Sequence, residues 1–270
     1  MPRARNWIEA AWWRAALLGI AWTTAQAGEL APPILRPEQL RPGMRGYGLS
    51  VFRGTEPERF EVEILGVLPN AFPKQDLILI RMSGADLEKH KVIAGMSGSP
   101  IYIEDKLIGA LGYGWAFENE PMAGVTPIHN MLADLQRPPA PPAADRRTEL
   151  WPTQLPASSV GTLPGVTPSR LALESPRPLV TPLACAGFRP QTLQPWADWL
   201  ERLGFWPVTA GGGGLGGEAD GKGPVALVPG SAMGVQLVRG DFNATAVGTV
   251  THVIGDRVLA FGHPFFQMGT

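Results

Sequence analysis

The sequence predicts a mostly β fold with a few short helices. Glycine (33) and proline (28) are both frequent among the 270 residues, while only 17% of the residues are charged. Such a composition favours short strands joined by turns over long helices. The segment RFEVEILGVL (59–68) alternates apolar and charged residues, which is the period of a half-buried strand. These observations argue against a helical bundle.

The block 28–136 is predicted to be a β domain. A second strand is expected at 76–82 (DLILIRM), and PIYIEDKLIGALGYGW predicts a hairpin with strands at 100–103 and 107–113. The segment 126–135 is predicted to be a helix, because Thr126 can cap it and the following proline suits the first helical position.

The region 137–223 is predicted to be a linker with one helix. It opens with a proline-rich stretch (137–159) that has no periodicity. The segment 190–205 places Trp196, Trp199, Leu200 and Leu203 on one helical face, and we expect this stripe to pack in a core.

A glycine run, AGGGGLGGEADGKG (210–223), resembles a phosphate-binding loop only in its glycines. No Lys-Ser/Thr pair follows it, so a mobile loop is expected. The last block, 224–270, again predicts β structure, with β-branched strands on either side of a turn at Gly255–Asp256.

The N-terminal 27 residues have the pattern of a signal peptide. Arginines precede a short apolar run (15–22), and Ala25 and Ala27 give the small-x-small pattern that a signal peptidase cleaves. We therefore expect an exported protein, periplasmic or extracellular, with no stable membrane insertion after cleavage. The alternative is an uncleaved anchor, although the apolar run is short for a membrane span.

Charge and residue counts narrow the function classes. A net charge of −1 gives no reason to expect a nucleic-acid partner. Cys185 is the single cysteine, so no intrachain disulfide can form. The four histidines have no spacing typical of metal ligands, and neither a metal nor another cofactor is expected.

The short motif GMSGSP (95–100) has the features of a nucleophile turn. A serine nucleophile needs a rigid turn that exposes its hydroxyl, with backbone N–H groups directed at the oxygen that becomes negative. Gly95 permits the unusual backbone angles that turn an N–H towards the site, and Gly98 allows close approach of a substrate carbonyl. The alternative is that the motif is an ordinary turn of small residues before a strand, without a catalytic role.

Two separated stretches resemble the SpoIVB-type serine peptidases of the trypsin-like clan. They are KVIAGMSGSPIYIEDKLIGALGYGW with AGVTPIHNML, and, downstream, GTVTHVIGDRVLAFGHPF. The resemblance implies a trypsin-like double β-barrel and a protein or peptide substrate. It also implies Ser97 as the nucleophile, His263 as the general base, and the N–H groups of Gly95 and Ser97 as the oxyanion hole.

The resemblance differs from the family pattern in two ways. The Gly-His segment follows the serine here, whereas it precedes the serine in the family, so the arrangement is permuted. The family acid precedes the serine motif, and Asp86 is the nearest candidate, with Asp76 as a fallback. An ordinary acid at a helix N-terminus is the alternative for Asp86.

The chain stops seven residues after His263, so we expect a fragment in which 224–270 begins an incomplete second barrel. The leading functional hypothesis is an exported serine endopeptidase. The alternatives are a non-catalytic binding or scaffold module of the cell envelope that retains the fold, and a peptidase that processes only itself.

Overall fold

The computed structural model describes residues 33–85, 87, 92–115, 120–136, 176–210 and 226–266. The predicted signal peptide, the proline-rich stretch 137–159 and the glycine run from 211 onward lie outside these residues. The predictions made for them therefore stay predictions.

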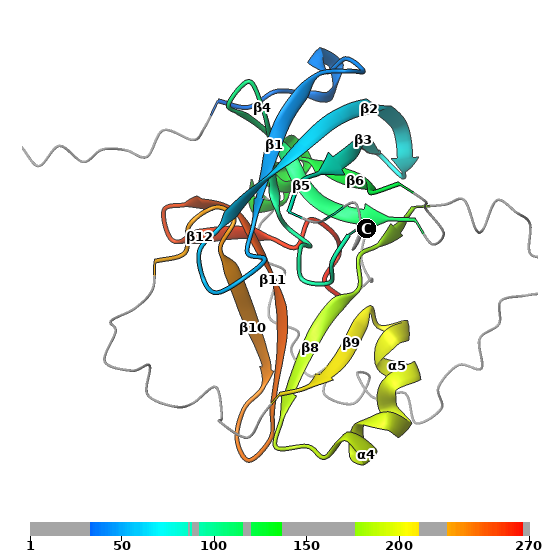
Figure 1. Ribbon diagram of the computed structural model, residues 1–270, viewed down its shortest axis with the longest axis vertical. Helices are drawn as coiled ribbons and strands as arrows, with labels where there is room; N and C mark the ends of the chain where they lie inside the picture. The colour runs from blue at the N-terminus through cyan, green and yellow to red at the C-terminus, as the bar shows by residue number, and fades with distance from the viewer. Residues whose placement is uncertain are drawn as a thin grey trace, which may run out of the picture. The chain divides into compact units, whose positions relative to one another are not determined.

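The first sheet closes into a six-stranded antiparallel barrel (Figure 1). Its strand order is β4-β1-β2-β3-β6-β5, and β4 pairs with both β1 and β5, which closes the ring. A short strand, β7, extends it at β5. The strands are β1 (Arg45–Ser50), β2 (Glu58–Phe72), β3 (Gln75–Ser83), β4 (Pro100–Ile103), β5 (Lys106–Gly114), β6 (Met122–Pro127) and β7 (Arg177–Pro178).

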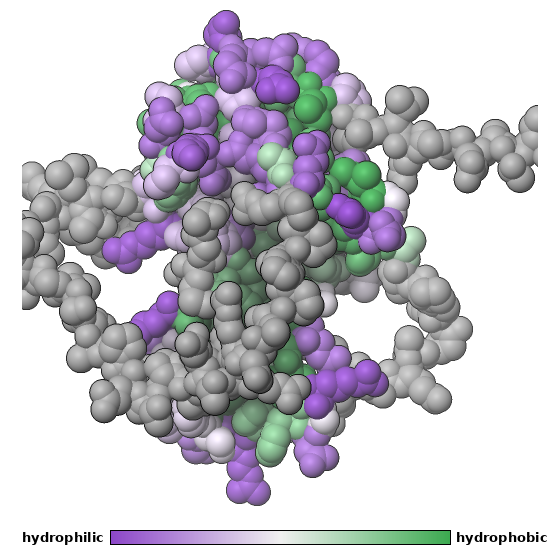
Figure 2. All heavy atoms as spheres, turned by 180° about the vertical axis from the view of Figure 1, so that it is seen from behind, coloured by the Kyte–Doolittle hydropathy of each residue, from purple (hydrophilic) through white to green (hydrophobic). Residues whose placement is uncertain are grey.

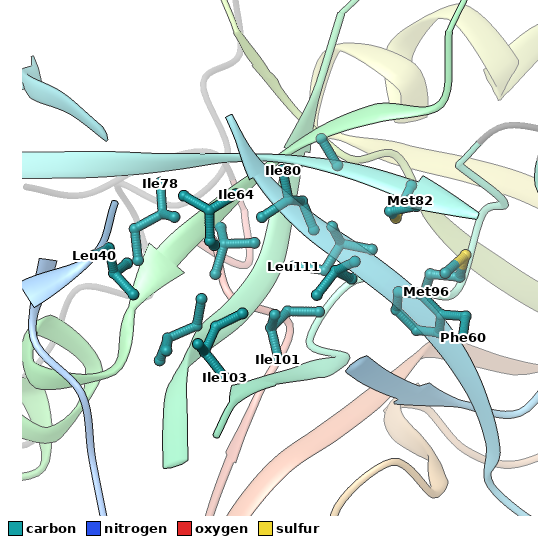
Figure 3. Close-up of a cluster of buried hydrophobic side chains, with 14 of the residues drawn as sticks. Leu40, Phe60, Ile64, Ile78, Ile80, Met82, Met96, Ile101, Ile103 and Leu111 are labelled. Atoms are coloured by element: carbon teal, nitrogen blue, oxygen red, sulfur yellow. The ribbon is translucent and has the colours of Figure 1, made fainter. Parts of the chain in front are cut away.

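The interior of this barrel is filled by aliphatic side chains. Alternate residues of β2 and β3, among them Ile64, Ile78 and Ile80, are fully buried, as the alternating sequence requires. Figure 3 shows these side chains converging with Met96, which enters the same core beside Phe60 and Met82. Because Met96 precedes Ser97, the barrel core anchors the serine motif.

The second sheet has the order β10-β11-β8-β9, with β12 paired to β11. All of its pairs are antiparallel except β8 with β9. Within the described residues this sheet remains open, so the described structure contains one closed barrel and one open sheet. The strands are β8 (Thr181–Ala186), β9 (Phe205–Thr209), β10 (Ala232–Val238), β11 (Asn243–Ile254) and β12 (Arg257–Ala260).

The described helices are short. They are η1 (Pro37–Gln39), α2 (Ile128–Gln136), α4 (Pro190–Leu193), η3 (Gln194–Trp196) and α5 (Ala197–Arg202). The longest, α2, has nine residues, so none of the described helices has the length and apolar character that a membrane span requires.

Most strand predictions in the first block are confirmed. Strands were expected at 59–68 and 76–82, and β2 and β3 contain them. The hairpin β4–β5 turns at Glu104 and Asp105, which both have positive φ, as a tight two-residue hairpin turn requires. The mostly β class, consistent with a trypsin-like fold, is also confirmed.

Two helix predictions need correction. The helix expected at 126–135 begins only at Ile128, because Thr126 and Pro127 belong to β6. The helix expected at 190–205 is divided into α4, η3 and α5. Pro195 lacks an N–H for the helical ladder, which accounts for the break.

The core expectation for the stripe on these helices holds for Leu200 and Leu203, which pack against the core of the second sheet, and is wrong for its tryptophans. Trp196 is 55% exposed, and Trp199 also lines a surface pocket. The same region contributes strands that the sequence did not indicate. β8 joins the second sheet by pairing with β11, and β9 pairs with β8, so 176–210 is not linker.

Candidate active site

The serine motif folds as two successive turns, which we call the serine turn (93–99). The Met96 amide donates to the Ile93 carbonyl, and the Ser99 amide donates to the Met96 carbonyl. Each turn has glycine at its third position, with φ of +100° at Gly95 and +99° at Gly98. Positive φ at this position is typical of type II turns and favours glycine strongly. The glycine spacing thus fixes the backbone around Ser97.

Both sheets hold the serine turn in place. On the barrel side, the Gly98 amide donates to the Leu111 carbonyl of β5 at 2.7 Å. On the other side, β11 donates three hydrogen bonds to turn carbonyls: from the Thr249 amide to Ser97, from the Thr249 hydroxyl to Gly95, and from the Thr251 hydroxyl to Gly98. The position of Ser97 therefore depends on strands about 150 residues downstream.

The strand β12 leads directly to the histidine. After Ala260, the chain makes a γ-turn in which the Gly262 amide donates to the Ala260 carbonyl, with φ of +66° at Phe261. This form of γ-turn is rare and strained. The Gly262 carbonyl accepts a hydrogen bond from the Thr126 hydroxyl at 2.5 Å. Because these contacts fix the backbone on both sides of Gly262, they direct the next residue, His263.

Ser97 and His263 are in hydrogen-bond contact. Ser97 Oγ lies 2.7 Å from His263 Nε2 and also 2.7 Å from the carbonyl oxygen of Phe261. The first distance is within the range of a nucleophile and its general base. The second shows that two acceptors are within reach of a single hydroxyl proton. Two residues 166 positions apart, chosen from the sequence as partners, meet in the fold.

The other nitrogen of the imidazole faces backbone. His263 Nδ1 lies 3.1 Å from the carbonyl oxygen of Pro264, which can accept a hydrogen bond from Nδ1–H and leave Nε2 as the acceptor. Burial lowers the pKa of His263, and the hydrogen bond with Pro264 partly opposes this effect. In the part of the chain that the structure describes, no carboxylate is hydrogen-bonded to the ring.

Asp86 and Asp76 were the two candidates for the acid of a catalytic triad. Asp86 lies outside the described residues. Asp76, the fallback, accepts a hydrogen bond from the Asn70 amide at 2.9 Å, at the β2–β3 turn. A backbone carbonyl, which no sequence motif identifies, occupies the position at Nδ1 that a carboxylate holds in a triad.

The predicted oxyanion donors are two amides of the serine turn. Within the described residues, no backbone hydrogen bond is donated by the amide of Gly95 or of Ser97. Two such donors in one turn are compatible with a site that binds a developing negative charge.

A pocket of about 360 Å³ opens beside the imidazole. Its walls come from β12 and the residues after it, from β6, and from α2, which contributes Asn130, Met131 and Asp134. Ser97 itself is fully buried. His263 therefore separates the buried hydroxyl from this pocket.

The remaining histidines lie apart from this contact. His129 is half-buried on α2, and His252 is buried on β11. His90 lies outside the described residues. Among the described residues, no group of His, Cys, Asp or Glu is arranged to hold a metal ion.

Sequence reasoning missed the threonines that connect the two sheets. Thr249 and Thr251 lie at alternate positions of β11, and Thr126 lies at the end of β6. The signal available for Thr249 and Thr251 was their alternation in GTVTHV, where polar residues interrupt a buried strand.

Thr126→Val is expected to destabilise the protein by about 1–3 kcal/mol, because it leaves the buried Gly262 carbonyl without its donor. Thr181→Val is the matched control, since Thr181 Oγ1 is buried without a hydrogen-bond partner among the described residues. That change should be neutral or stabilising. Chemical denaturation of both variants measures the difference. Equal losses of stability would show that the Thr126 contact contributes nothing.

The comparisons with known proteins address the half of the site that contains the serine. The SpoIVB peptidase S55 family model matches residues 29–132. The match confirms the resemblance to SpoIVB-type peptidases for a segment that contains the barrel strands β1–β6 and Ser97. It covers less than half of the chain and does not reach His263. Searches of curated proteins and of solved structures each found no match.

Proposed function

We propose that this protein is an exported serine endopeptidase of the SpoIVB type, in which Ser97 is the nucleophile and His263 is the general base. The observation that carries the proposal is the 2.7 Å contact between Ser97 Oγ and His263 Nε2. The S55 family match over the segment with Ser97 supports a protein substrate. The signal-peptide pattern of the first 27 residues supports export.

The proposed reaction uses only side chains and backbone. Nε2 accepts the Ser97 proton as Oγ attacks the scissile carbonyl, and the N–H groups of Gly95 and Ser97 stabilise the oxyanion. The imidazolium then gives its proton to the leaving amine. Water, deprotonated by the same histidine, hydrolyses the acyl-enzyme. Pro264 O stabilises the imidazolium through Nδ1–H, and Asp86 is the candidate acid if a carboxylate also contributes.

The hydrogen bond from Ser97 Oγ to the Phe261 carbonyl belongs to a resting state of the proposed enzyme. A hydroxyl that donates to the Phe261 carbonyl is not donating to Nε2, so the two acceptors compete for one proton. Ser97 is also fully buried. Catalysis therefore requires Ser97 Oγ to give up its hydrogen bond to the Phe261 carbonyl and to become accessible to a substrate carbonyl.

The same observations favour the second candidate function. A buried serine hydroxyl bound to a backbone carbonyl, with no described carboxylate at Nδ1, also fits a non-catalytic cell-envelope module that retains a peptidase fold. The two candidates differ in whether Ser97 can be acylated or phosphonylated.

A fluorophosphonate probe tests the choice. We expect the mature protein to be labelled covalently and Ser97→Ala to be unlabelled. Ser99→Ala is the matched control: Ser99 lies two residues away, is equally buried and donates to the Met96 carbonyl, so its loss should leave labelling at Ser97 intact. Absence of labelling in the wild type would sink the peptidase proposal, whereas labelling that survives Ser97→Ala would reassign the nucleophile.

The labelling rate should depend on pH in the direction set by the histidine. Only neutral His263 can accept the Ser97 proton, and burial lowers its pKa below the ordinary value of 6.5. The rate should therefore fall as the pH drops, with a midpoint below 6.5, and should be constant from neutral pH upward. Rates measured between pH 4.5 and pH 8 check this, and a midpoint above 6.5 would contradict it.

A further inference from the structure

A second pocket, of about 330 Å³, lies between the second sheet and the short helices. One wall is the sheet, where Leu183 and Cys185 of β8 and Phe205 of β9 line it. The opposite wall is helical, with Trp196, Trp199 and Leu200. We call this space the tryptophan pocket. Figure 2 shows hydrophobic side chains at the surface of the lower end of the molecule, where Figure 1 places α4, α5 and the β10–β11 hairpin.

The chemistry of the tryptophan pocket is almost purely apolar. Every described lining residue is aliphatic, aromatic or the thiol-bearing Cys185, and no charged side chain contributes. A phosphate, a carboxylate or a sugar would lose its hydration there without finding partners. Its volume is at the lower end of the range for ligand pockets, about 300–1,000 Å³, so it suits one or two large apolar side chains.

The pocket is connected to the candidate active site through the segment that carries His263. Phe266, three residues after the histidine, is part of its wall. Phe265 packs on Phe261, whose carbonyl contacts Ser97 Oγ, with ring centroids 4.9 Å apart, and also on Phe205, at 5.5 Å. A continuous series of aromatic contacts therefore joins the γ-turn beside Ser97 to Phe205 in the wall of the pocket.

The strand β8 provides a second connection. Pro182, next to the pocket residue Leu183, is the residue nearest to a Cβ added at Gly95, with its Cγ 3.9 Å away. The strand that forms part of the pocket thus also flanks the serine turn.

We propose that the tryptophan pocket is a substrate subsite that binds a large apolar side chain, leucine or an aromatic residue, of the polypeptide to be cleaved. That the bound polypeptide is a substrate rests on the proposed peptidase function, whereas binding of its apolar side chain in the pocket does not. A polypeptide is favoured over a lipid surface or a second copy of this chain because the pocket is joined to the Ser97–His263 contact. An occupant of the pocket contacts Phe205, whose ring is linked through Phe265 to Phe261 in the γ-turn.

Cys185 provides a direct measurement of occupancy. It is the only cysteine of the chain, is buried, and lines the pocket, so N-ethylmaleimide reports on one site. The protein is Ser97→Ala, which cannot cleave the peptide. The probes are a blocked peptide that contains leucine and phenylalanine, and the same peptide with both replaced by serine.

We expect only the apolar peptide to protect Cys185. At a peptide concentration about ten times the Kd, about a tenth of the pockets stay open, so modification should slow about tenfold. Equal protection by both peptides, or protection by neither, would overturn the proposal. Protection only by phosphatidylcholine vesicles, or only by raised protein concentration, would overturn it in favour of a lipid surface or a second copy.

A pair of surface variants locates the effect. Leu237 lines the pocket and is 38% exposed, so Leu237→Asp should fold and should abolish protection. Leu68, on β2 of the barrel, is 39% exposed and is absent from the pocket wall, so Leu68→Asp should leave protection unchanged. Protection that survives Leu237→Asp would overturn the assignment. Protection in a protein whose wild type is not labelled by fluorophosphonate would sink the peptidase function alone.

Discussion

His263→Ala is expected to lower the rate of fluorophosphonate labelling of Ser97 by a factor of about 10²–10⁴, the range that general-base catalysis contributes. Nε2 is the only side-chain nitrogen described within hydrogen-bond distance of Ser97 Oγ. Without it, the hydroxyl keeps the Phe261 carbonyl as its acceptor, and a carbonyl cannot take the proton away. The rate constant of labelling at pH 7.5 is the measurement.

His129→Ala is the matched control for this change. His129 is also half-buried, and burial also lowers its pKa, yet it lies on α2 without a contact to Ser97. Its loss should leave the labelling rate unchanged. If His129→Ala slows labelling as much as His263→Ala does, the effect is structural and the base assignment fails. The residual rate of His263→Ala should also lose the pH dependence of the wild type.

The strands β2–β5 could be predicted from the sequence because their signals are local, whereas β1 and β6 were not predicted and the barrel itself came from the resemblance. The alternation in β2 and the hairpin β4–β5 each lie within one short segment. The identity of Ser97 was also local, since the glycines on either side set the two turns. The choice of His263 as its partner, which lies in contact with Ser97, came from the resemblance and not from any pattern that places 97 beside 263.

The parts that sequence reasoning missed depend on contacts between distant segments. Thr126 was read as a helix cap because its neighbours permit one, but its hydroxyl donates to the Gly262 carbonyl, 136 residues away. The tryptophans near 196 have helical spacing and were expected in a core, but they line an open pocket. Periodicity indicates which face is apolar, and it does not indicate what covers that face.

Gly98→Ala is expected to be the most destabilising substitution in the serine turn. A Cβ at this position would overlap the carbonyl oxygen of Thr249 and the amide nitrogen of Phe261, which are both backbone atoms. Side chains can rotate away from an added methyl group, whereas backbone cannot do so without moving β11 and the γ-turn at Phe261. We expect a loss of at least about 3 kcal/mol, from an unfavourable φ combined with overpacking.

Gly95→Ala separates these two causes. Gly95 has almost the same φ, +100° against +99°, yet the nearest atom to its added Cβ is Pro182 Cγ at 3.9 Å, an ordinary contact. It should therefore cost only the backbone strain, about 1–3 kcal/mol. Denaturant unfolding of both variants gives the difference, and equal losses would contradict the close approach of the second sheet to Gly98.

The comparison also determines what glycine does in this motif. If Gly98→Ala loses both stability and labelling while Gly95→Ala loses mainly labelling, the two glycines have separate roles. Gly98 then permits the two sheets to meet closely enough for Ser97 to reach His263, and Gly95 shapes the turn whose amides are the proposed oxyanion donors. Because the Thr249 and Thr251 hydrogen bonds to the turn run across the same interface, docking of β11 and assembly of the site are one event. A protein in which β11 is displaced should therefore keep its barrel core and lose the contact between Ser97 and His263.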